Sequence, residues 1–453
     1  MSELPLEFRR EILGPLAAKL RARKSTQLLG VGSCGKSNIV RQLARPDVQA
    51  LYLREEAPTL LYLNVDCQAL SDYRDSSVYA LLLRELGRKL GARTDAAHAL
   101  QGQINEWYRQ ARRADGETLA RDQLEDALTL LLDGPIRLLI VLLDDCDDLI
   151  RHASPALLKS FRALRDDHKE QLTYATVTRR ELAHLETRAP NQTEMAPEFE
   201  AFFELFAAHS IVITPYQEDD AKTMLSRLEA REDIATPPLS PSSRSEILRL
   251  SGGHAGLIKA CYEILKSMGR LPEGDPADYL YRKQLVYAEC KKIWQSLEPY
   301  EHTDLKALAA KTKPEGAGLN PLQKKGLLFK QRDNTLSFFS PLFARFVSEE
   351  TGAPAPPTAP RLVFDAARGS VTVNAHTTQL KPTEAELFGY LWENRPRACS
   401  LGELLNVMLR VDAGAQLQAR LERHLYHLAA RLNRNDITVL RQNADKSWQI
   451  VIP

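Results

Sequence analysis

The sequence predicts an α/β protein: a three-layer N-terminal domain with a mostly parallel sheet, followed by smaller modules. In the first half, short apolar runs of strand length alternate with segments of helical period. This alternation is typical of a parallel sheet covered by helices. From Glu218 to about Glu350 the pattern turns mainly helical. The expected strands are 27–29, 60–65, 136–143, 172–177 and 210–214, and the clearest helices are 77–90 and 118–132.

Length and composition place the chain among ordinary globular proteins. Its 453 residues, at roughly 150 per domain, predict about three domains. Sixty basic against 59 acidic side chains give a net charge of +1, so DNA binding requires a local basic patch. The longest strongly apolar run, 138–143, is far shorter than the ~20 residues of a membrane-spanning helix. With no secretion signal and six scattered cysteines, we expect a cytoplasmic protein with reduced thiols and no membrane partner.

A phosphate-binding loop follows the first strand. Residues 30–37 read Gly-Val-Gly-Ser-Cys-Gly-Lys-Ser, which fits G-x-x-x-x-G-K-[ST] between a strand and the helical segment 38–43. Glycines let backbone amides turn toward phosphates, and the helix N-terminus adds positive charge. We therefore predict an α/β P-loop NTPase that binds ATP and Mg²⁺, with Lys36 on the outer phosphates and Ser37 on the metal. The expected nucleotide-binding residues are Gly30, Gly32, Ser33, Cys34, Gly35, Lys36, Ser37 and Asn38.

Two interpretations of Cys34 remain open. A helix N-terminus lowers the pKa of a thiol, which would make nucleotide binding sensitive to oxidation. Alternatively, Cys34 is a small residue that the loop tolerates.

A second acidic segment supports the nucleotide site. Residues 137–145 form an apolar strand that ends in two carboxylates, as in a Walker B segment. We expect Asp144 to hold Mg²⁺ and Asp145 to orient or deprotonate an attacking water. Asp147 and Asp148 are interpreted as a helix cap or a solvated loop. Asp145 stands where fast ATPases commonly have glutamate, which leaves the hydrolysis rate open. Either ATP is mostly a held ligand, or the protein is a slow ATPase whose hydrolysis resets a switch.

With both Walker segments in place, residues 5–350 resemble the STAND class of P-loop ATPases, near the AAA+ and origin-recognition ATPases. In that class an arginine after a strand senses the γ-phosphate, which implies Arg179 in the run Thr-Val-Thr-Arg-Arg at 176–180. Arg180 is the neighbouring alternative, and a surface ion pair is the other interpretation. The stretch 251–257 resembles the segment that packs a lid helix near the nucleotide, with Ala255 in place of the family's proline. His254 is either functional there or a buried, satisfied side chain.

The resemblance implies a domain order. The P-loop ATPase domain spans 1–215 and the helical lid 216–270. A winged-helix module at 271–350 is expected to fold back on the nucleotide domain as a latch, with a wing hairpin flanked by 326–328 and 336–338. Four prolines in ten residues make 351–360 a semi-rigid linker.

The last 93 positions, 361–453, resemble an OmpR/PhoB-type winged-helix DNA-binding domain. Short strands at 362–364 and 371–373 precede Leu-Lys-Pro-Thr-Glu-Ala-Glu-Leu at 380–387, with Thr383 as an expected N-cap. A capping box at 400–403 opens a second helix, 416–432 forms a third, and 437–440 can pair with 448–451. The family places its third helix in the major groove. This implies DNA contacts from Arg420, Arg423, His424, His427, Arg431, Arg434, Arg441 and Lys446.

The expected DNA patch is modest. Between positions 415 and 446 there are six basic residues and three acidic ones, and Ala429 and Ala430 stand where the family has basic groups. We interpret the chain as an ATP-dependent switch that acts as a DNA-binding transcription regulator and forms a nucleotide-dependent homo-oligomer. Two alternatives remain: an assembly or defence sensor whose winged helices bind protein partners, and an origin-recognition-like DNA loader.

Overall fold

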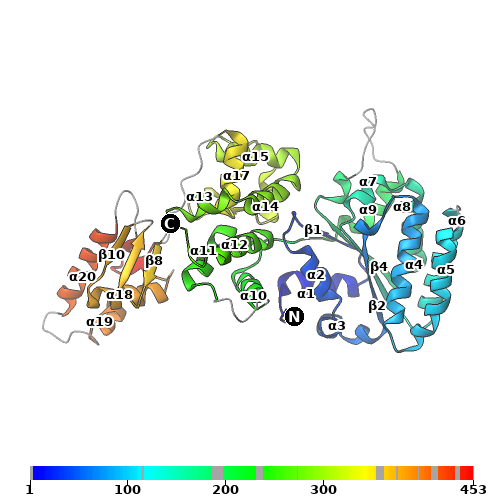
Figure 1. Cartoon of the computed structure of the whole chain (residues 1–453), viewed down its shortest axis with the longest axis horizontal. Coiled ribbons are helices and arrows are strands. Elements are labelled where there is room, and N and C mark those ends of the chain that lie inside the picture. The colour runs from blue at the N-terminus through cyan, green and yellow to red at the C-terminus, as the bar shows by residue number, and fades with distance from the viewer. Residues whose placement is uncertain are drawn as a thin grey trace.

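The computed structural model arranges the chain as three bodies in a row along its longest axis (Figure 1). An α/β domain is followed by a helical middle part and a smaller C-terminal module. The structure describes residues 4–113, 117–185, 197–230, 238–272, 274–352, 362–373, 376–395, 397–409, 417–433 and 439–451. Within these ranges, no helix combines the length and apolar character needed to cross a bilayer.

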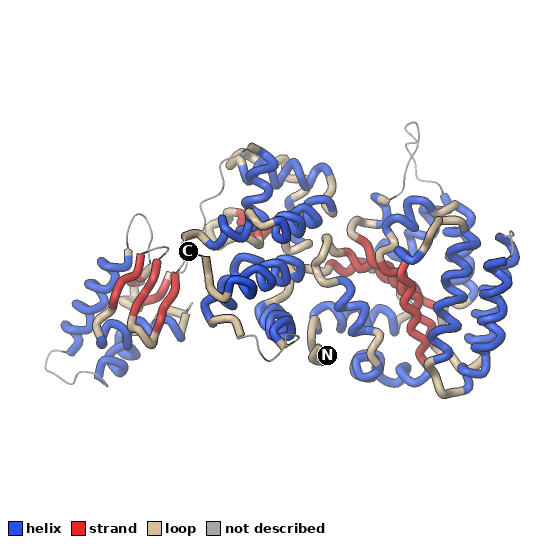
Figure 2. The backbone as a smooth tube through the Cα atoms, in the orientation of Figure 1, coloured by secondary structure: helices blue, strands red, loops and turns tan. Residues whose placement is uncertain are grey.

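A five-stranded parallel sheet organises the N-terminal domain. Its strands are β1 (Thr26–Leu29), β2 (Leu60–Asp66), β3 (Leu138–Asp144), β4 (Leu172–Thr178) and β5 (Ser210–Val212). They lie in the order β2-β3-β4-β1-β5, and every neighbouring pair is parallel. Helices cover both faces of the sheet (Figure 2), which explains why β2 and β3 are largely apolar along their length. This sheet and its covering helices match an α/β P-loop NTPase fold, as predicted.

Strand β5 is shorter than expected. The sequence predicts a strand through Thr214, but β5 ends at Val212. The carbonyl of Thr214 accepts a hydrogen bond from Arg9 Nη2 at 2.8 Å, and Pro215, which follows, has no amide hydrogen for a ladder.

The covering helices form two layers with separate cores. Helices α4 to α9 pack over one face of the sheet, and α1 to α3 over the other. The predicted segments 77–90 and 118–132 lie within α4 and α6. The helices are α1 (Arg10–Arg21), α2 (Lys36–Leu43), α3 (Pro46–Leu53), α4 (Asp75–Gly91), α5 (Gln101–Arg113), α6 (Glu117–Leu132), α7 (Asp147–His152), α8 (Pro155–Asp167) and α9 (Pro197–Ala207).

The middle part holds residues 216–270, expected to form the helical lid, and the 271–350 module. The lid has α10 (Glu218–Glu229), α11 (Pro241–Ser251) and α12 (Ala255–Met268). The module has α13 (Pro276–Tyr281), α14 (Gln284–Gln295), α15 (Pro299–Ala309), α16 (Leu319–Lys324), β6 (Leu328–Lys330), β7 (Leu336–Phe338) and α17 (Pro341–Thr351). Strands β6 and β7 pair antiparallel, with Leu328 opposite Phe338, where a hairpin is predicted. Lid, module and the α1 side of the sheet share one continuous hydrophobic core.

The C-terminal module has its own core and follows the predicted order of elements, with one strand more than expected. It contains β8 (Leu362–Asp365), β9 (Ser370–Val373), β10 (His376–Gln379), α18 (Pro382–Glu393), α19 (Leu401–Leu409), α20 (Leu417–Leu432), β11 (Leu440–Gln442) and β12 (Trp448–Ile450). Strand β11 pairs antiparallel with β12, with Leu440 opposite Ile450. The expected linker segment 353–360, and positions 416, 437 and 438, lie outside the described residues.

The N-cap prediction at Thr383 is wrong. Helix α18 begins at Pro382, and Lys381 occupies the cap position. Proline suits the first helical position because its missing amide hydrogen would have no partner there, and the Glu384 carboxylate accepts the Lys381 amide at 2.9 Å. The capping box at Ser400 is confirmed, since Glu403 accepts the Ser400 amide at 2.7 Å and Ser400 Oγ accepts the Glu403 amide at 3.3 Å.

Candidate functional site

A cavity of about 750 Å³ lies where the phosphate loop, the lid and α14 meet. The loop connects β1 to α2, so its residues sit at the carboxyl end of a central strand, where ligands bind in open α/β sheets. Six cationic side chains and three carboxylates line the cavity: Lys36, Arg41, Arg179, Arg227, Lys259, Lys292, Asp145, Glu263 and Glu289. An excess of positive charge around a phosphate loop suits an anionic ligand.

Close neighbours leave no room for a side chain at Gly32 and Gly35 of the loop. Gly35 has φ +102°, and a Cβ there would lie 2.6 Å from the Tyr216 hydroxyl oxygen. A Cβ on Gly32 would lie 2.8 Å from the backbone oxygen of Lys292. The loop therefore stays free of side chains at Gly32 and Gly35, as a phosphate cradle requires, and the residues present fit a nucleotide.

Lys36 lies folded over its own loop. Its side chain is nearly buried, and Nζ donates to the carbonyl oxygens of Gly30 at 2.9 Å and Val31 at 3.2 Å. Asn38 Nδ2 donates to the Tyr216 hydroxyl at 2.7 Å, while Ser37 lines the cavity. The structure thus brings the predicted phosphate-loop residues together.

Cys34 is a buried thiol whose pKa is raised. Its side chain is fully buried, and burial raises the pKa of the thiol in spite of the nearby Lys36 and Arg9 cations. A raised pKa removes the thiolate that oxidation requires. The interpretation of Cys34 as a tolerated small residue is therefore supported. All six cysteines are free thiols with buried side chains.

Carboxylates gather at the ends of β2 and β3. Asp144 ends β3 and pairs in register with Asp66 at the end of β2. Burial, followed by the charges of Asp145 and Asp66, raises the pKa of Asp144 to about 6. A divalent cation would relieve this repulsion, and the Ser37 hydroxyl and the Asp144 carboxylate are oxygen donors of the kind Mg²⁺ prefers.

No three His, Cys, Asp or Glu side chains among the described residues form a metal-binding cluster. The predicted Mg²⁺ site is of another kind, in which phosphates and water complete the coordination. Asp66 was not anticipated from the sequence, although it ends an apolar strand just as Asp144 does.

Asp145 and Arg179 form an ion pair at the border of the cavity. Asp145 has φ +48° and accepts a hydrogen bond from Gln68 Nε2 at 3.1 Å. Arg179 Nη2 lies 3.8 Å from Asp145 Oδ1, and both residues line the cavity with Lys36. The predicted base and the predicted sensor therefore share one site.

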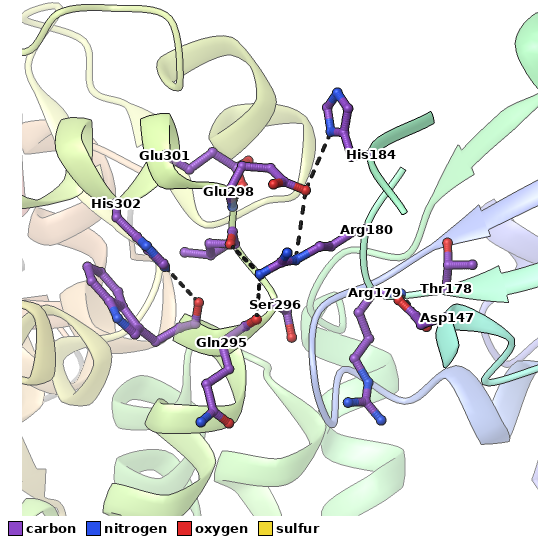
Figure 3. Close-up of polar contacts among 12 residues, drawn as sticks. Asp147, Thr178, Arg179, Arg180, His184, Gln295, Ser296, Glu298, Glu301 and His302 are labelled. Carbon is purple, nitrogen blue, oxygen red and sulfur yellow. Dashed lines mark hydrogen bonds and ion pairs between the residues drawn. The ribbon is translucent and has the colours of Figure 1, made fainter. Parts of the chain in front are cut away.

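Asp147 is neither a helix cap nor a solvated loop residue, since α7 begins at Asp147 with Cys146 at the cap position. It is 8% exposed and accepts the backbone amide of Arg179 at 3.0 and 3.2 Å (Figure 3). Its carboxylate therefore fixes the end of β4. The sequence does not predict this contact, because an acidic residue after a strand is usually solvated. Asp148 is exposed, as expected, and pairs with Arg151 at 3.0 Å.

Arg180 points toward the 271–350 module (Figure 3). It is not among the residues that line the 750 Å³ cavity, although it borders a smaller polar cavity with Asp145 and Arg179. Its Nη2 donates to the backbone oxygens of Gln295 and Leu297, each at 3.4 Å. Its Nε lies 3.8 Å from Glu298 Oε1, and His184 Nδ1 lies 3.4 Å from the same atom. Arg180 is therefore an ion-pair partner of a nearly buried carboxylate on the module.

His254 connects the lid to the phosphate loop. It is fully buried; Nε2 donates to the carbonyl oxygen of Gly32 at 2.9 Å, and Nδ1 accepts the Leu257 amide at 3.3 Å. Burial lowers its pKa to about 4, so the ring is neutral. The interpretation as a buried, satisfied histidine is confirmed, and helix α12 begins at Ala255 without the family's proline.

The expected DNA-contacting residues differ in exposure and in their contacts. Arg423 and His427 on α20, and Arg441 and Lys446 near the β11–β12 hairpin, are exposed, whereas Arg420 and His424 are half-buried. Arg431 is partly exposed but bonded to its own module: Nη1 donates to Glu384 Oε2 at 2.7 Å, and Nη2 contacts the Gln379 carbonyl oxygen. Arg434 lies outside the described residues.

No protein-family model matches the chain, and no curated protein matches it. Among solved structures, it is similar to the Walker-type ATPase of Pyrococcus abyssi, at 17% identity and TM-score 0.41, over 75% of this chain and 95% of that one. It is also similar to the ORC2 protein of Aeropyrum pernix in its ADP form, at 13% identity and TM-score 0.42, over 78% and 96% of the two chains. A third is the ORC1 protein of Aeropyrum pernix in complex with DNA, at 14% identity and TM-score 0.36, over 91% and 94%.

Proposed function

We propose that the protein is an ATP-dependent switch in which the 271–350 module is a latch docked on the phosphate loop. The observation that carries this proposal is a single hydrogen bond: the Gly32 amide donates to Ser296 Oγ at 2.8 Å. Ser296 is almost completely buried. A backbone amide of the phosphate-binding loop is thus bonded to a hydroxyl from a module about 260 residues away.

Further contacts support the same docked arrangement. The Gly256 amide of the lid donates to the Ser33 carbonyl oxygen at 3.0 Å, and Arg180 bonds the latch at Gln295 and Leu297. The shared hydrophobic core adds apolar burial, which is the dominant favourable term in such contacts. Loop, lid and latch are therefore held as one closed unit.

The chain's own groups would exchange partners when nucleotide binds. Magnesium-bound ATP supplies phosphate oxygens and a transferable phosphoryl group to a site of this kind. Lys36 Nζ would leave the carbonyls of Gly30 and Val31, and Ser37 and Asp144 would hold the metal. The Gly32 amide would leave Ser296 for a triphosphate, so the closed latch favours a diphosphate and the open latch a triphosphate. Asp145 would orient water for slow hydrolysis, which restores the closed form.

The test compares ADP and a non-hydrolysable ATP analogue on the full chain by equilibrium binding. Ser296→Ala should raise affinity for the ATP analogue relative to ADP, since it removes the competitor for the Gly32 amide. Lys36→Ala should abolish binding of both. Unchanged relative affinities in Ser296→Ala would argue against the latch, and retained binding in Lys36→Ala would overturn the site itself.

A second proposal concerns the C-terminal module, which we assign as a winged helix that contacts double-stranded DNA. Exposed Arg423 and His427 on α20, with Arg441 and Lys446 near the hairpin, offer contacts to phosphates. Few side chains remain for reading bases, because Arg431 is bonded to Glu384 and position 430 is alanine. Contacts of this kind position DNA more than they specify a sequence. They favour an origin-recognition-like DNA loader over a transcription regulator.

Binding of the full chain to fragmented genomic DNA at physiological salt, with and without Mg-ATP, tests this DNA-binding role. A loader should retain DNA broadly in one nucleotide state and self-associate there, and a regulator should enrich a few promoter-proximal sites. If DNA is retained in neither nucleotide state, the C-terminal module is a winged helix that binds protein partners.

A further inference from the structure

Helix α14 of the latch lines the nucleotide cavity along one of its faces. Leu285, Glu289, Lys292 and Ser296 border the cavity at spacings of three or four residues, which places them on one side of a helix. Gln295 also borders it, and it shares a second, polar cavity of about 310 Å³ with Asp145 and Arg179. The end of α14 near Ser296 therefore lies at the phosphate end of the site.

Lys292 lies directly against the phosphate loop. Its Cβ and backbone oxygen are within 3 Å of the position that a Cβ on Gly32 would take. Its side chain is about half exposed, and Nζ is bonded to Glu289 Oε1 at 2.6 Å. Both groups are on α14, so an intrahelical partner holds this cation at the edge of the cavity.

Glu289 is an incompletely satisfied carboxylate. Its side chain is 15% exposed, and Oε2 is buried without a hydrogen-bond partner. The same oxygen would lie 2.1 Å from a Cβ on Gly256, beside Ser33. A carboxylate at the edge of an anion site raises the free energy of a bound phosphate and competes with it for the lysine.

We propose that Lys292 is a phosphate ligand that the latch contributes to a nucleoside diphosphate in the closed state, and that Glu289 is its competitor. The inference rests on the proposed latch and adds a specific cation to it. Lysine suits the role because its ammonium group is a point charge on a flexible stem, able to move from Glu289 to a phosphate without moving the helix. When the latch opens for a triphosphate, Lys292 leaves with α14.

Titration of the full-length protein with ADP and with a non-hydrolysable ATP analogue tests the proposal. Lys292→Met keeps the apolar stem against Gly32 and should lower ADP affinity about tenfold, the value of one charge-assisted hydrogen bond. Affinity for the ATP analogue should change much less. Glu289→Gln should raise ADP affinity roughly threefold, because it removes a competing charge. The matched control is Lys291→Met, since Lys291 is exposed and not among the residues that line the cavity.

The outcomes separate this proposal from the one on which it rests. Wild-type protein that binds neither nucleotide would overturn the proposed switch. Wild-type binding with unchanged ADP affinity in Lys292→Met would overturn the role of Lys292 alone, as would equal losses for both nucleotides. Amide hydrogen exchange of α14 without nucleotide should match wild type in each variant, and faster exchange in Lys292→Met would assign its effect to docking instead.

Discussion

Arg179 and Arg180 are consecutive residues at the end of β4, yet they contact different parts of the molecule. Arg179 lines the nucleotide cavity opposite Asp145, whereas Arg180 reaches the latch at Gln295, Leu297 and Glu298. One short piece of backbone, fixed by Asp147, therefore connects the phosphate end of the site to the docked module.

Loss of the Arg180 side chain should loosen the latch. Arg180 is about one-third exposed, so we expect Arg180→Ala to weaken docking by only about 1 kcal/mol. Hydrogen exchange of residues 284–298 without nucleotide should become faster. Arg121→Ala removes a more exposed ion pair on α6, remote from the latch, and should leave this exchange unchanged. Equal behaviour of the two variants would mean that Arg180 does not hold the latch.

The buried pair of Glu301 and Lys325 should stabilise the latch itself. Glu301 is fully buried and lies 2.7 Å from Lys325 Nζ. Lys325→Met leaves an uncompensated buried carboxylate, which should cost about 3–5 kcal/mol in the free energy of unfolding. Urea denaturation followed by tryptophan fluorescence measures this, because Trp294 lies in the same module. The double variant with Glu301→Gln should recover part of the loss, and no recovery would mean that the packing of Lys325 matters more than its charge.

Asp144 should destabilise the nucleotide-free protein above about pH 6. Its folded pKa of about 6 exceeds the ordinary value of 3.8, so the native state binds more protons than the unfolded chain between these values. Stability therefore falls as pH rises through this window. Asp144→Asn should raise the free energy of unfolding by about 1–2 kcal/mol at pH 7.5, after allowance for partial exposure. The gain should vanish below pH 4, and a gain independent of pH would contradict this origin.

The basic residues of the C-terminal module should differ in their effects on DNA binding. Arg423→Ala and Arg441→Ala should each weaken binding and lower the slope of log affinity against log salt by about one. Arg431→Ala should instead lower the melting temperature of the module, because Arg431 neutralises the nearly buried Glu384. A loss of salt dependence in Arg431→Ala at unchanged stability would reverse this assignment.

The sequence predicts those parts of the fold and site that depend on local patterns. Five apolar runs mark the parallel sheet, and the glycines and Lys36 mark the phosphate loop because phosphate binding requires those residue types in that order. The end of β3 marks Asp144 and Asp145 for the same reason. Thr383 shows the limit of local reasoning: a threonine before a helical pattern is a common cap, but Pro382 begins the helix one position earlier.

Contacts between distant residues could not be predicted. Ser296 bonds to Gly32, Arg180 contacts Glu298, and Arg431 bonds to Glu384. The periodicity of the sequence does not indicate which distant residues come into contact. A basic residue at the position of Arg431 has the same sequence signature whether it faces DNA or a buried carboxylate. Asp147 likewise follows a strand, where a solvated residue is also common. It is buried because its carboxylate bonds to the Arg179 amide at the end of the neighbouring strand β4.

The most direct test of the switch is the distance between the ATPase domain and the latch in each nucleotide state. Spin labels at Leu130→Cys and Lys330→Cys, both exposed positions, would report it, since all six native cysteines are buried. We expect one narrow distribution of the distance between the labels without nucleotide and with ADP. With a non-hydrolysable ATP analogue, the distances should become longer and more broadly distributed. The Lys36→Ala variant should not show this change. An identical narrow distribution in all three states, with binding of the analogue verified, would contradict it.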